Sequence, residues 1–299
     1  MSATIASLRK TINSAKDLQS VVRTMKALAA SSIAQYEQSV RALGDYDRAV
    51  ELGLGVCIRN GGGAVLPTER TGGAIGVVVF GSDQGLVGRF NDVVADHAIA
   101  MLAARPDASQ VWAVGERVRE PLAEAGLSIA GLFAVPLSVN SIVPLVGQIL
   151  GEYEARLSTG QIAELHLVYN KPSTDGVYEP IGQRLLPLDE NWRRDLADVR
   201  WPTPSLPEAI GGNAMALSAF VREYLFVSLF RACAASLASE NASRLAAMQR
   251  ADKNIDTLLE DLNGRFHRLR QNGIDEELFD VVAGYEALTT DSSTGQNDR

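Results

Sequence analysis

The fold is decided by residues 5–57, IASLRKTINSAKDLQSVVRTMKALAASSIAQYEQSVRALGDYDRAVELGLGVC. Apolar residues recur through this stretch at alternating steps of three and four, and only Gln19, Lys26 and Asp47 interrupt the series. A repeat of about 3.5 residues over such a length is typical of helices that supercoil around a partner, whereas a helix on a globular core drifts toward about 3.6. The stretch therefore predicts a long helix with a helical partner along its length.

A second segment with the same spacing lies toward the C-terminus. Its apolar seam runs from Ala238 to Gly273 and is interrupted by Asn241 and Asp252, and small residues are frequent at 232–247. Polar residues in such a seam fix the register of two helices and lower their stability. A continuous helix from 207 to 286 would be about 120 Å long at ~1.5 Å per residue, so we expect much of it to project beyond any domain of this chain.

The prolines divide the chain into three parts. All 11 lie between Pro67 and Pro207, and proline is excluded from long helices because it lacks a backbone donor and clashes with the preceding turn. We therefore expect an N-terminal coiled-coil helix at 1–58, an α/β domain at 73–200 and a C-terminal coiled-coil helix at 207–288. We expect the two helices to pair antiparallel, with the α/β domain inserted between them.

Two other interpretations of the apolar stripes are open. They are also the pattern of core faces in an ordinary helical bundle, although the length of the repeat argues against this. A coiled coil between two copies of the chain is the other interpretation. Because both helices join the same middle domain, pairing within one chain is simpler and needs no second copy.

The middle of the chain alternates between predicted strands and helices. AIGVVVFG at 74–81 is a valine-rich apolar run bounded by glycine, typical of a strand that is covered on both faces. The other predicted elements are strands at 110–114, 128–135, 164–169 and 178–186, helices at 91–104, 116–125 and 139–157, and turns or linkers at 60–63, 170–172, 175–176 and 201–204. This order predicts an open, mostly parallel, Rossmann-like sheet with the last strand at an edge.

Bulk composition argues against several classes of function. The net charge of −8 and pI near 5.0 do not favour nucleic acid as a partner. Two distant cysteines and three scattered histidines show no metal-ligand spacing, so we expect no metal or cofactor and a reducing compartment. The N-terminus lacks the apolar core of a signal peptide, and the most apolar helical stretch, 225–238, is too short to span a membrane. We expect neither export nor direct lipid insertion.

The loop GSDQGLVG at 81–88 is the most enzyme-like feature, because it joins a strand to a helix. Its G-x-x-x-G-x-x-G spacing matches neither a dinucleotide fingerprint nor a P-loop, and Ser82 has no hydrolase elbow around it. We interpret Ser82, Asp83, Gly85 and Gly88 as a structural turn. Two alternatives are a nucleotide-binding α/β protein with a coiled-coil lever, and a structural tether.

Three separated stretches resemble the gamma subunit of F-type ATP synthases. They lie in the opening helix, in the S-D-x-G-L-x-G-x-x-N turn, and near the C-terminus. The matching residues are Leu8, Arg9, Ile12, Ser14, Gln19, Met25, Lys26, Ala29 and Ala30; Ser82, Asp83, Gly85, Leu86, Gly88 and Asn91; and Arg270, Gln271, Ile274, Glu277, Asp280, Gly284 and Ala287. Their order and spacing agree over nearly the whole chain.

The resemblance implies a non-catalytic rotor subunit of a central stalk. The terminal helices would sit in the hollow of an alpha/beta hexamer (alpha3beta3), and the α/β domain would stand on the membrane c-ring with the epsilon subunit, at the cytoplasmic face of a bacterial inner membrane. Ion flow would then be coupled to nucleotide affinity at the beta subunits.

The resemblance also implies that Met25, Lys26, Arg270 and Gln271 contact the beta subunits. The alternative for each of these residues is a solvated helix position. We further expect residues 289–299, which are polar and contain glycine, to be a disordered tail.

Overall fold

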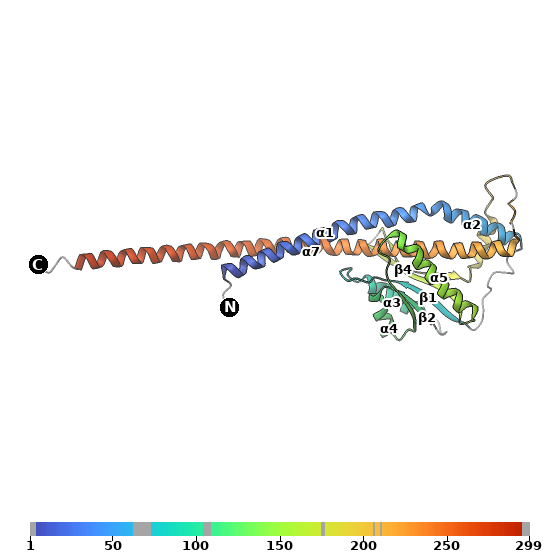
Figure 1. The fold of residues 1–299 in the computed structure, drawn as a ribbon, viewed down its shortest axis with the longest axis horizontal. Coiled ribbons are helices and arrows are strands. Elements are labelled where there is room, and N and C mark those ends of the chain that lie inside the picture. Colours follow the sequence, from blue (N-terminus) through green and yellow to red (C-terminus); the bar gives the residue numbers. More distant parts are fainter. Residues whose placement is uncertain are drawn as a thin grey trace. The chain divides into compact units, whose positions relative to one another are not determined.

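The computed structural model describes residues 4–61, 73–103, 109–174, 177–205, 207–209 and 211–294, and for 284–294 it describes the backbone alone. The elements are α1 (Ile5–Ala42), α2 (Gly44–Arg59), β1 (Ala74–Phe80), α3 (Phe90–Ala103), β2 (Ser109–Val114), α4 (Glu116–Glu124), β3 (Ile129–Phe133), the short 3-10 helix η2 (Val139–Ser141), α5 (Ile142–Ser158), β4 (Ile162–Pro172), β5 (Tyr178–Leu186), α6 (Glu190–Asp198) and α7 (Asn213–Thr294) (Figure 1). None of the described helices is long and apolar enough to cross a membrane.

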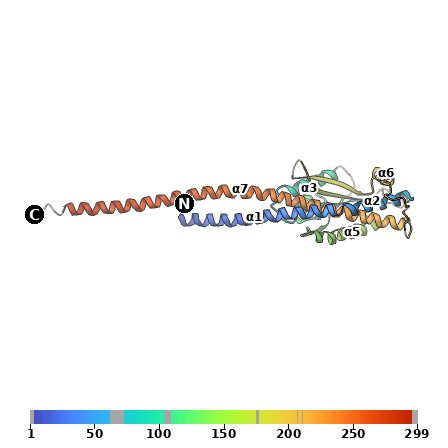
Figure 2. The ribbon, with the colours of Figure 1, turned by 90° about the horizontal axis from the view of Figure 1, so that it is seen from above.

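The chain divides into two compact units, and α1 and α7 each contribute to both. The first unit is Met1–Lys26 with Met248–Arg299, and the second is Ala27–Ala247. In the first unit α1 lies beside α7 and runs antiparallel to it (Figure 2). The predicted seams supply the buried side chains, which are Leu8, Ile12, Ala15, Gln19 and Val22 from α1 and Met248, Ile255, Leu259 and Leu262 from α7. The predicted antiparallel pairing of the chain ends is confirmed.

The sheet of the second unit has the strand order β3-β2-β1-β4-β5 among the described residues. β1 is parallel to β2 and β4, whereas β5 is antiparallel to β4 at the edge. The prediction of a mostly parallel sheet with a last edge strand is therefore confirmed. Neighbouring valines of β1 face opposite ways, because side chains alternate across a strand, so both faces of the sheet need cover.

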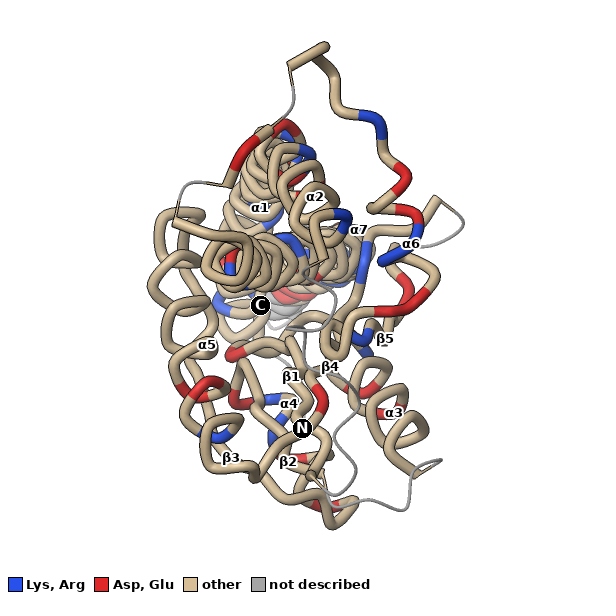
Figure 3. Tube along the Cα trace, turned by 90° about the vertical axis from the view of Figure 1, so that its right-hand side faces the viewer, with Lys and Arg blue, Asp and Glu red and all other residues tan. Residues whose placement is uncertain are grey.

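Each face of the sheet packs against its own helices. Ile75, Val77 and Val79 form one buried cluster with apolar residues of α3 and α4. Val78 and Phe80 form the other with residues of α2, α5, α6 and α7. Figure 3 shows α7 between α2 and the strands. This unit therefore has its main core between the sheet and α7.

Helix limits differ from those expected at several places. The N-terminal helix is interrupted at Leu43, next to Gly44, where a residue without a side chain weakens helix formation. α7 begins at Asn213 and not near 207, because Gly211 and Gly212 have φ values of +86° and +98°, which an α-helix does not accept. The linker at 60–63 and the turn at 175–176 lie partly or wholly outside the described residues.

Two further differences concern whole segments. The predicted disordered tail is wrong for residues 289–294, because α7 continues to Thr294, and residues 295–299 lie outside the described part. Extending an existing helix costs far less than nucleating one, so polar residues continue it. Helix α6 was not expected. Its start is marked by Asp189, whose carboxylate accepts hydrogen bonds from the backbone N–H groups of Asn191 and Trp192, at 2.9 and 3.0 Å.

We predict that Gly55→Ala destabilises the second unit. The Cβ of an alanine on α2 would lie 2.3 Å from the carbonyl oxygen of Leu196 on α6, so the two helices would have to move apart. Overpacking of this kind costs ~1–3 kcal/mol, measured by urea denaturation of the full chain. Gly147→Ala on α5 is the control, because nothing lies within 4 Å of its added Cβ. The control should gain ~0.5–1 kcal/mol from helix propensity, and equal effects of the two changes would contradict the packing assignment.

Candidate functional site

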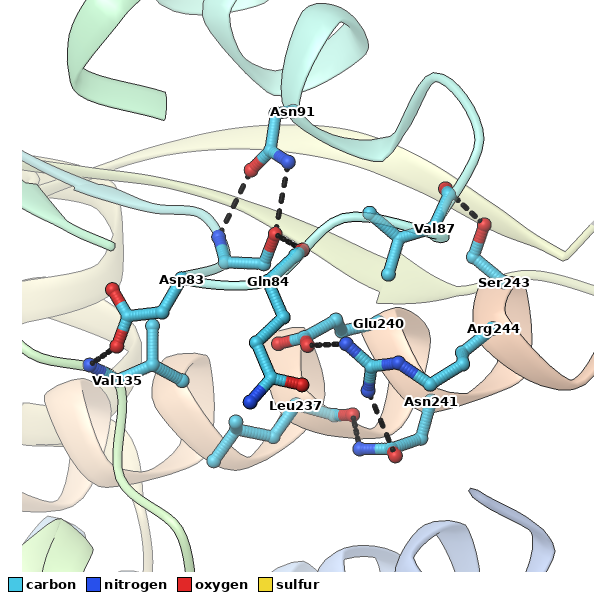
Figure 4. A network of polar contacts seen from close by, with 11 residues as sticks. Asp83, Gln84, Val87, Asn91, Val135, Leu237, Glu240, Asn241, Ser243 and Arg244 are labelled. Atoms are coloured by element: carbon cyan, nitrogen blue, oxygen red, sulfur yellow. Dashed lines mark hydrogen bonds and ion pairs between the residues drawn. The ribbon is translucent and has the colours of Figure 1, made fainter. Parts of the chain in front are cut away.

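The loop at residues 81–89 leaves the carboxyl end of β1 and leads into α3 (Figure 4). Ser82 is fully buried, and its backbone N–H donates to Oδ1 of Asn91 at 2.9 Å. Nδ2 of Asn91 in turn donates to Oγ of Ser82, also at 2.9 Å. The Ser82 hydroxyl donates to the carbonyl oxygen of Gln84 at 2.9 Å. The hydroxyl that a hydrolase would use as a nucleophile therefore holds the turn closed.

Asp83 ties this loop to two others. Its Oδ1 accepts from the backbone N–H of Glu116 at 2.9 Å, and its Oδ2 accepts from that of Val135 at 2.8 Å. Glu116 is the first residue of α4, where the unpaired N–H groups of the helix attract an anion. The chain's own carboxylate thus satisfies an N–H group at the start of α4 that an external anion could otherwise bind.

The tip of the loop carries an exposed apolar residue in a strained conformation. Leu86 has φ of +64°, a region that costs a non-glycine residue roughly 1–2 kcal/mol, and its side chain is 61% exposed. Gly88 follows with φ of +57°. Between them, the Val87 side chain is buried and its carbonyl oxygen accepts from Oγ of Ser243 on α7, at 2.6 Å. The loop therefore packs on α7 through Val87 and presents Leu86 outward.

Small residues of α7 make close approaches to the same end of the sheet. Oγ of Ser239 donates to the carbonyl oxygen of Asn170, at the end of β4, at 3.1 Å. Nδ2 of Asn170 donates to the carbonyl oxygen of Phe90 at 3.0 Å, which joins β4 to the start of α3. The small residues at 232–247 thus let α7 lie against the carboxyl edge of the sheet.

A buried ion pair lies on α7 beside the loop. Nη2 of Arg244 is 2.5 Å from Oε1 of Glu240, and the two side chains are only 12% and 7% exposed. Nη1 of Arg244 also donates to Oδ1 of Asn241 at 3.3 Å. Burial raises the pKa of Glu240, and the nearby Asp83 carboxylate adds to the rise, although the Arg244 charge opposes it. A charged Glu240 therefore depends on Arg244 as its partner.

The four predicted contact residues all belong to the first unit and form two separate pairs. Met25 and Lys26 are half-buried on α1, and Nζ of Lys26 is 3.5 Å from Oδ2 of Asp252. Arg270 and Gln271 are exposed on α7. Arg270 lies about 27 Å beyond Asp252 along the helix at ~1.5 Å per residue, so the structure does not bring the two pairs together.

Sequence reasoning missed the Glu240–Arg244 pair. A glutamate followed four residues later by an arginine, inside a segment of small residues, was the available signal. A spacing of four on an exposed helix face is common, however, and only the tertiary packing around α7 makes this pair buried. Within the described ranges, no cluster of three or more His, Cys, Asp or Glu side chains could hold a metal ion.

The sequence profile of the ATP synthase family matches residues 4–288, so the chain belongs to this family. Its relatives include the ATP synthase gamma chain of Anaeromyxobacter sp. (strain Fw109-5), which is 26% identical over 94% of this chain and 98% of its own. The ATP synthase gamma chain of Clostridium pasteurianum is also 26% identical, over 96% of this chain and 99% of its own.

Solved structures share the fold. A chain of the Euglena gracilis mitochondrial ATP synthase, in a structure of OSCP, F1 and c-ring, superposes with a TM-score of 0.63 at 15% identity and covers 99% of this chain and 98% of its own. A chain of the Tetrahymena thermophila central stalk and c-ring superposes with a TM-score of 0.55 at 20% identity, over 77% of this chain and 99% of its own.

We predict that Arg244→Met strongly destabilises the second unit. It leaves the Glu240 carboxylate buried without a countercharge, which costs ~3–5 kcal/mol in a denaturation experiment. Arg265→Met is the matched control, because the Arg265–Asp261 pair is exposed on the same helix and contributes at most ~1 kcal/mol. The double variant Glu240→Leu/Arg244→Met should be more stable than Arg244→Met alone. If it is not, the loss has another cause than the stranded carboxylate.

Asp83→Ala separates the structural interpretation of the loop from a nucleotide site. We expect it to remove two backbone hydrogen bonds and cost ~1–3 kcal/mol, with no gain in ATP affinity by isothermal titration calorimetry. A nucleotide site would respond in the opposite way, because removing the carboxylate from the start of α4 would strengthen phosphate binding. Glu124→Ala, exposed in the last turn of α4, is the control.

Proposed function

We propose that this chain is the central-stalk rotor subunit of an F-type ATP synthase. In this role it couples ion flow through the c-ring to changes in nucleotide affinity at the catalytic beta subunits, and it carries no catalytic residues itself. Family membership supports the proposal, as do the gamma chains among its relatives. One observation in the structure carries it furthest, the exposed apolar end of α7.

The end of α7 extends well past the start of α1 in the first unit (Figures 1 and 2). Every side chain described at 274–283 is exposed. Five of these are large and apolar, namely Ile274, Leu278, Phe279, Val281 and Val282, which are 54%, 61%, 73%, 70% and 47% exposed. Such a run of apolar surface on one helix marks a site of contact with another protein. The hollow of an alpha3beta3 hexamer is the partner that fits a single projecting helix.

Rotation can change nucleotide affinity only if the shaft contacts the catalytic subunits unequally. A ligand or partner shifts an equilibrium only by the difference between its affinities for the two states. A pair of helices has an asymmetric cross-section, and beyond the start of α1 only α7 continues. Each orientation of the shaft would therefore press differently on three otherwise equal beta subunits.

The remaining partners follow from the same role. The α/β domain would stand on the c-ring with the epsilon subunit, and the protein would be peripheral at the cytoplasmic face of a bacterial inner membrane. We assign contact with the beta subunits to Met25 and Lys26 on α1 and to Arg270 and Gln271 on α7. Arg270 suits an acidic or carbonyl-lined surface, because a guanidinium is always charged and donates several directed hydrogen bonds.

Two other functions make different demands. A nucleotide-binding lever protein requires the loop at 81–89 to receive phosphate, and the hydrogen bonds that Ser82 and Asp83 make within the chain argue against this. A tether without a rotary partner is tested by purification from the native membrane. The rotor proposal expects an alpha/beta hexamer in stoichiometric amounts with this chain.

We predict that Arg270→Ala leaves the protein folded and assembled but weakens coupling. Ion pumping per ATP hydrolysed should fall by about five-fold or more, because one charged contact between α7 and the beta subunits is lost. Reconstituted vesicles give pumping from the quenching of a pH- or ion-sensitive dye, and hydrolysis from phosphate release. Arg268→Ala, exposed on the same helix, is the control. Unchanged pumping and hydrolysis in Arg270→Ala would remove Arg270 from the contact residues.

A further inference from the structure

The polar interruptions of the two apolar seams meet one another in the first unit. Gln19 and Lys26 interrupt the α1 seam, and Asp252 interrupts that of α7. Nε2 of Gln19 is 3.3 Å from Oδ1 of Asp252, and Nζ of Lys26 is 3.5 Å from Oδ2. Arg23, between them on α1, donates from Nε to Oδ1 of Asp252 at 3.1 Å. One carboxylate on α7 is therefore shared by three donors from two successive turns of α1.

Asp256 extends the network by one helical turn. Its Oδ1 lies 2.5 Å from Nε2 of Gln19 and 3.6 Å from Nη2 of Arg23. The Gln19 amide thus bridges two carboxylates that stand four residues apart on the same face of α7. Donors are confined to α1 and acceptors to α7, so each helix supplies what the other needs.

The inner part of the network is buried. Gln19 is 8% exposed and the Asp252 side chain is 15% exposed, whereas the side chains of Arg23 and Asp256 are more than half exposed. Burial alone raises the pKa of Asp252, but the hydrogen bond and charge of Arg23, with help from Gln19 and Lys26, bring it below its ordinary value. The carboxyl is therefore charged at neutral pH and keeps its three donors.

An apolar seam with steps of three and four specifies its register weakly. A slip by one step places apolar residues against apolar residues again, so the packing loss is small. The same slip would move Asp252 away from Gln19 and Lys26 and leave a partly buried charge facing apolar side chains, which is strongly unfavourable. Single polar residues in a seam specify one register in this way, at a cost in stability.

We propose that Asp252, through Gln19, Arg23 and Lys26, is the positioning residue that fixes the register of α1 on α7. The mechanical consequence, that the two helices turn as one rigid body, rests on the rotor function proposed above. A shaft whose helices slide past each other would absorb twist within itself and would not deliver it to the catalytic subunits. Asp252 also holds Lys26, one of the proposed contacts with the beta subunits.

The register can be measured on the full-length chain without any partner. Spin labels are placed at exposed positions 10 on α1 and 260 on α7, with Cys57 and Cys233 replaced by alanine, and the distance between the labels is measured by pulsed electron resonance. The native chain should give one distance. Asp252→Leu should broaden the distribution or add a second maximum shifted by roughly 5 Å, the rise of one seam step. Asp261→Asn, which removes a carboxylate paired only within α7, should leave it unchanged.

The variant Asp252→Asn covers the case in which Asp252→Leu does not fold. It keeps the shape and one acceptor oxygen but loses the charge, so we expect a partial broadening. Thermal unfolding followed by circular dichroism gives an independent test. Asp252→Leu should unfold at about the native temperature, because the apolar residue fills the seam while the Arg23 and Lys26 side chains, which are 58% and 40% exposed, reach solvent instead. A single unshifted distance in both variants would overturn the proposal.

In the reconstituted complex, Asp252→Leu should hydrolyse ATP but lose about five-fold or more of its pumping per ATP. Full pumping together with a broadened distance would overturn the mechanical part of the proposal. If the native chain does not assemble with an alpha/beta hexamer at all, the rotor function fails, while the distance measurement still decides whether Asp252 sets the register. The two failures are therefore distinguishable.

Discussion

The chain depends on the pairing of its two ends along one apolar seam. An isolated helix of this composition is only marginally stable in water, because helix formation in proteins is stabilised mainly by the burial of an apolar face. Here each terminal helix buries its seam on the other, so neither can form its full length without the rest of the chain. The insertion of the α/β domain between them makes this pairing intramolecular and keeps the two helices at a fixed stoichiometry of one to one.

Apolar burial provides stability, and polar contacts at a few places provide uniqueness. Asp47 pairs with Arg231, Asp252 with its three donors from α1, and Glu240 with Arg244 inside α7. Asp47 and Asp252 interrupt the apolar seams, Glu240 lies next to the seam of α7, and each is satisfied by a partner of opposite charge or by a hydrogen-bond donor. An entirely apolar seam would pair more strongly but would specify the register of the two helices less well.

The loop at 81–89 shows how a Rossmann-like sheet serves a different purpose. In such folds the carboxyl edge of the strands commonly receives a ligand. Here Ser82, Asp83 and Val87 use that edge to close the turn, to start α4 and to contact Ser243 of α7. This edge of the sheet therefore packs against α7, and the side chains of Ser82 and Asp83 make their hydrogen bonds within the chain.

Much of this architecture follows from the sequence by itself. The steps of three and four at 5–57 and at 238–273 predict the paired helices, and the valine-rich run at 74–81 predicts a central strand. Both follow from the sequence because helical and strand periodicities are local properties. Only the tertiary structure decided which side chains meet. That Gln19 and Lys26 share Asp252, that Glu240 is buried with Arg244, and that Asp83 caps α4 all depend on residues far apart in the chain or on packing around them. Such pairings are set by the register and approach of whole elements, which no local pattern encodes.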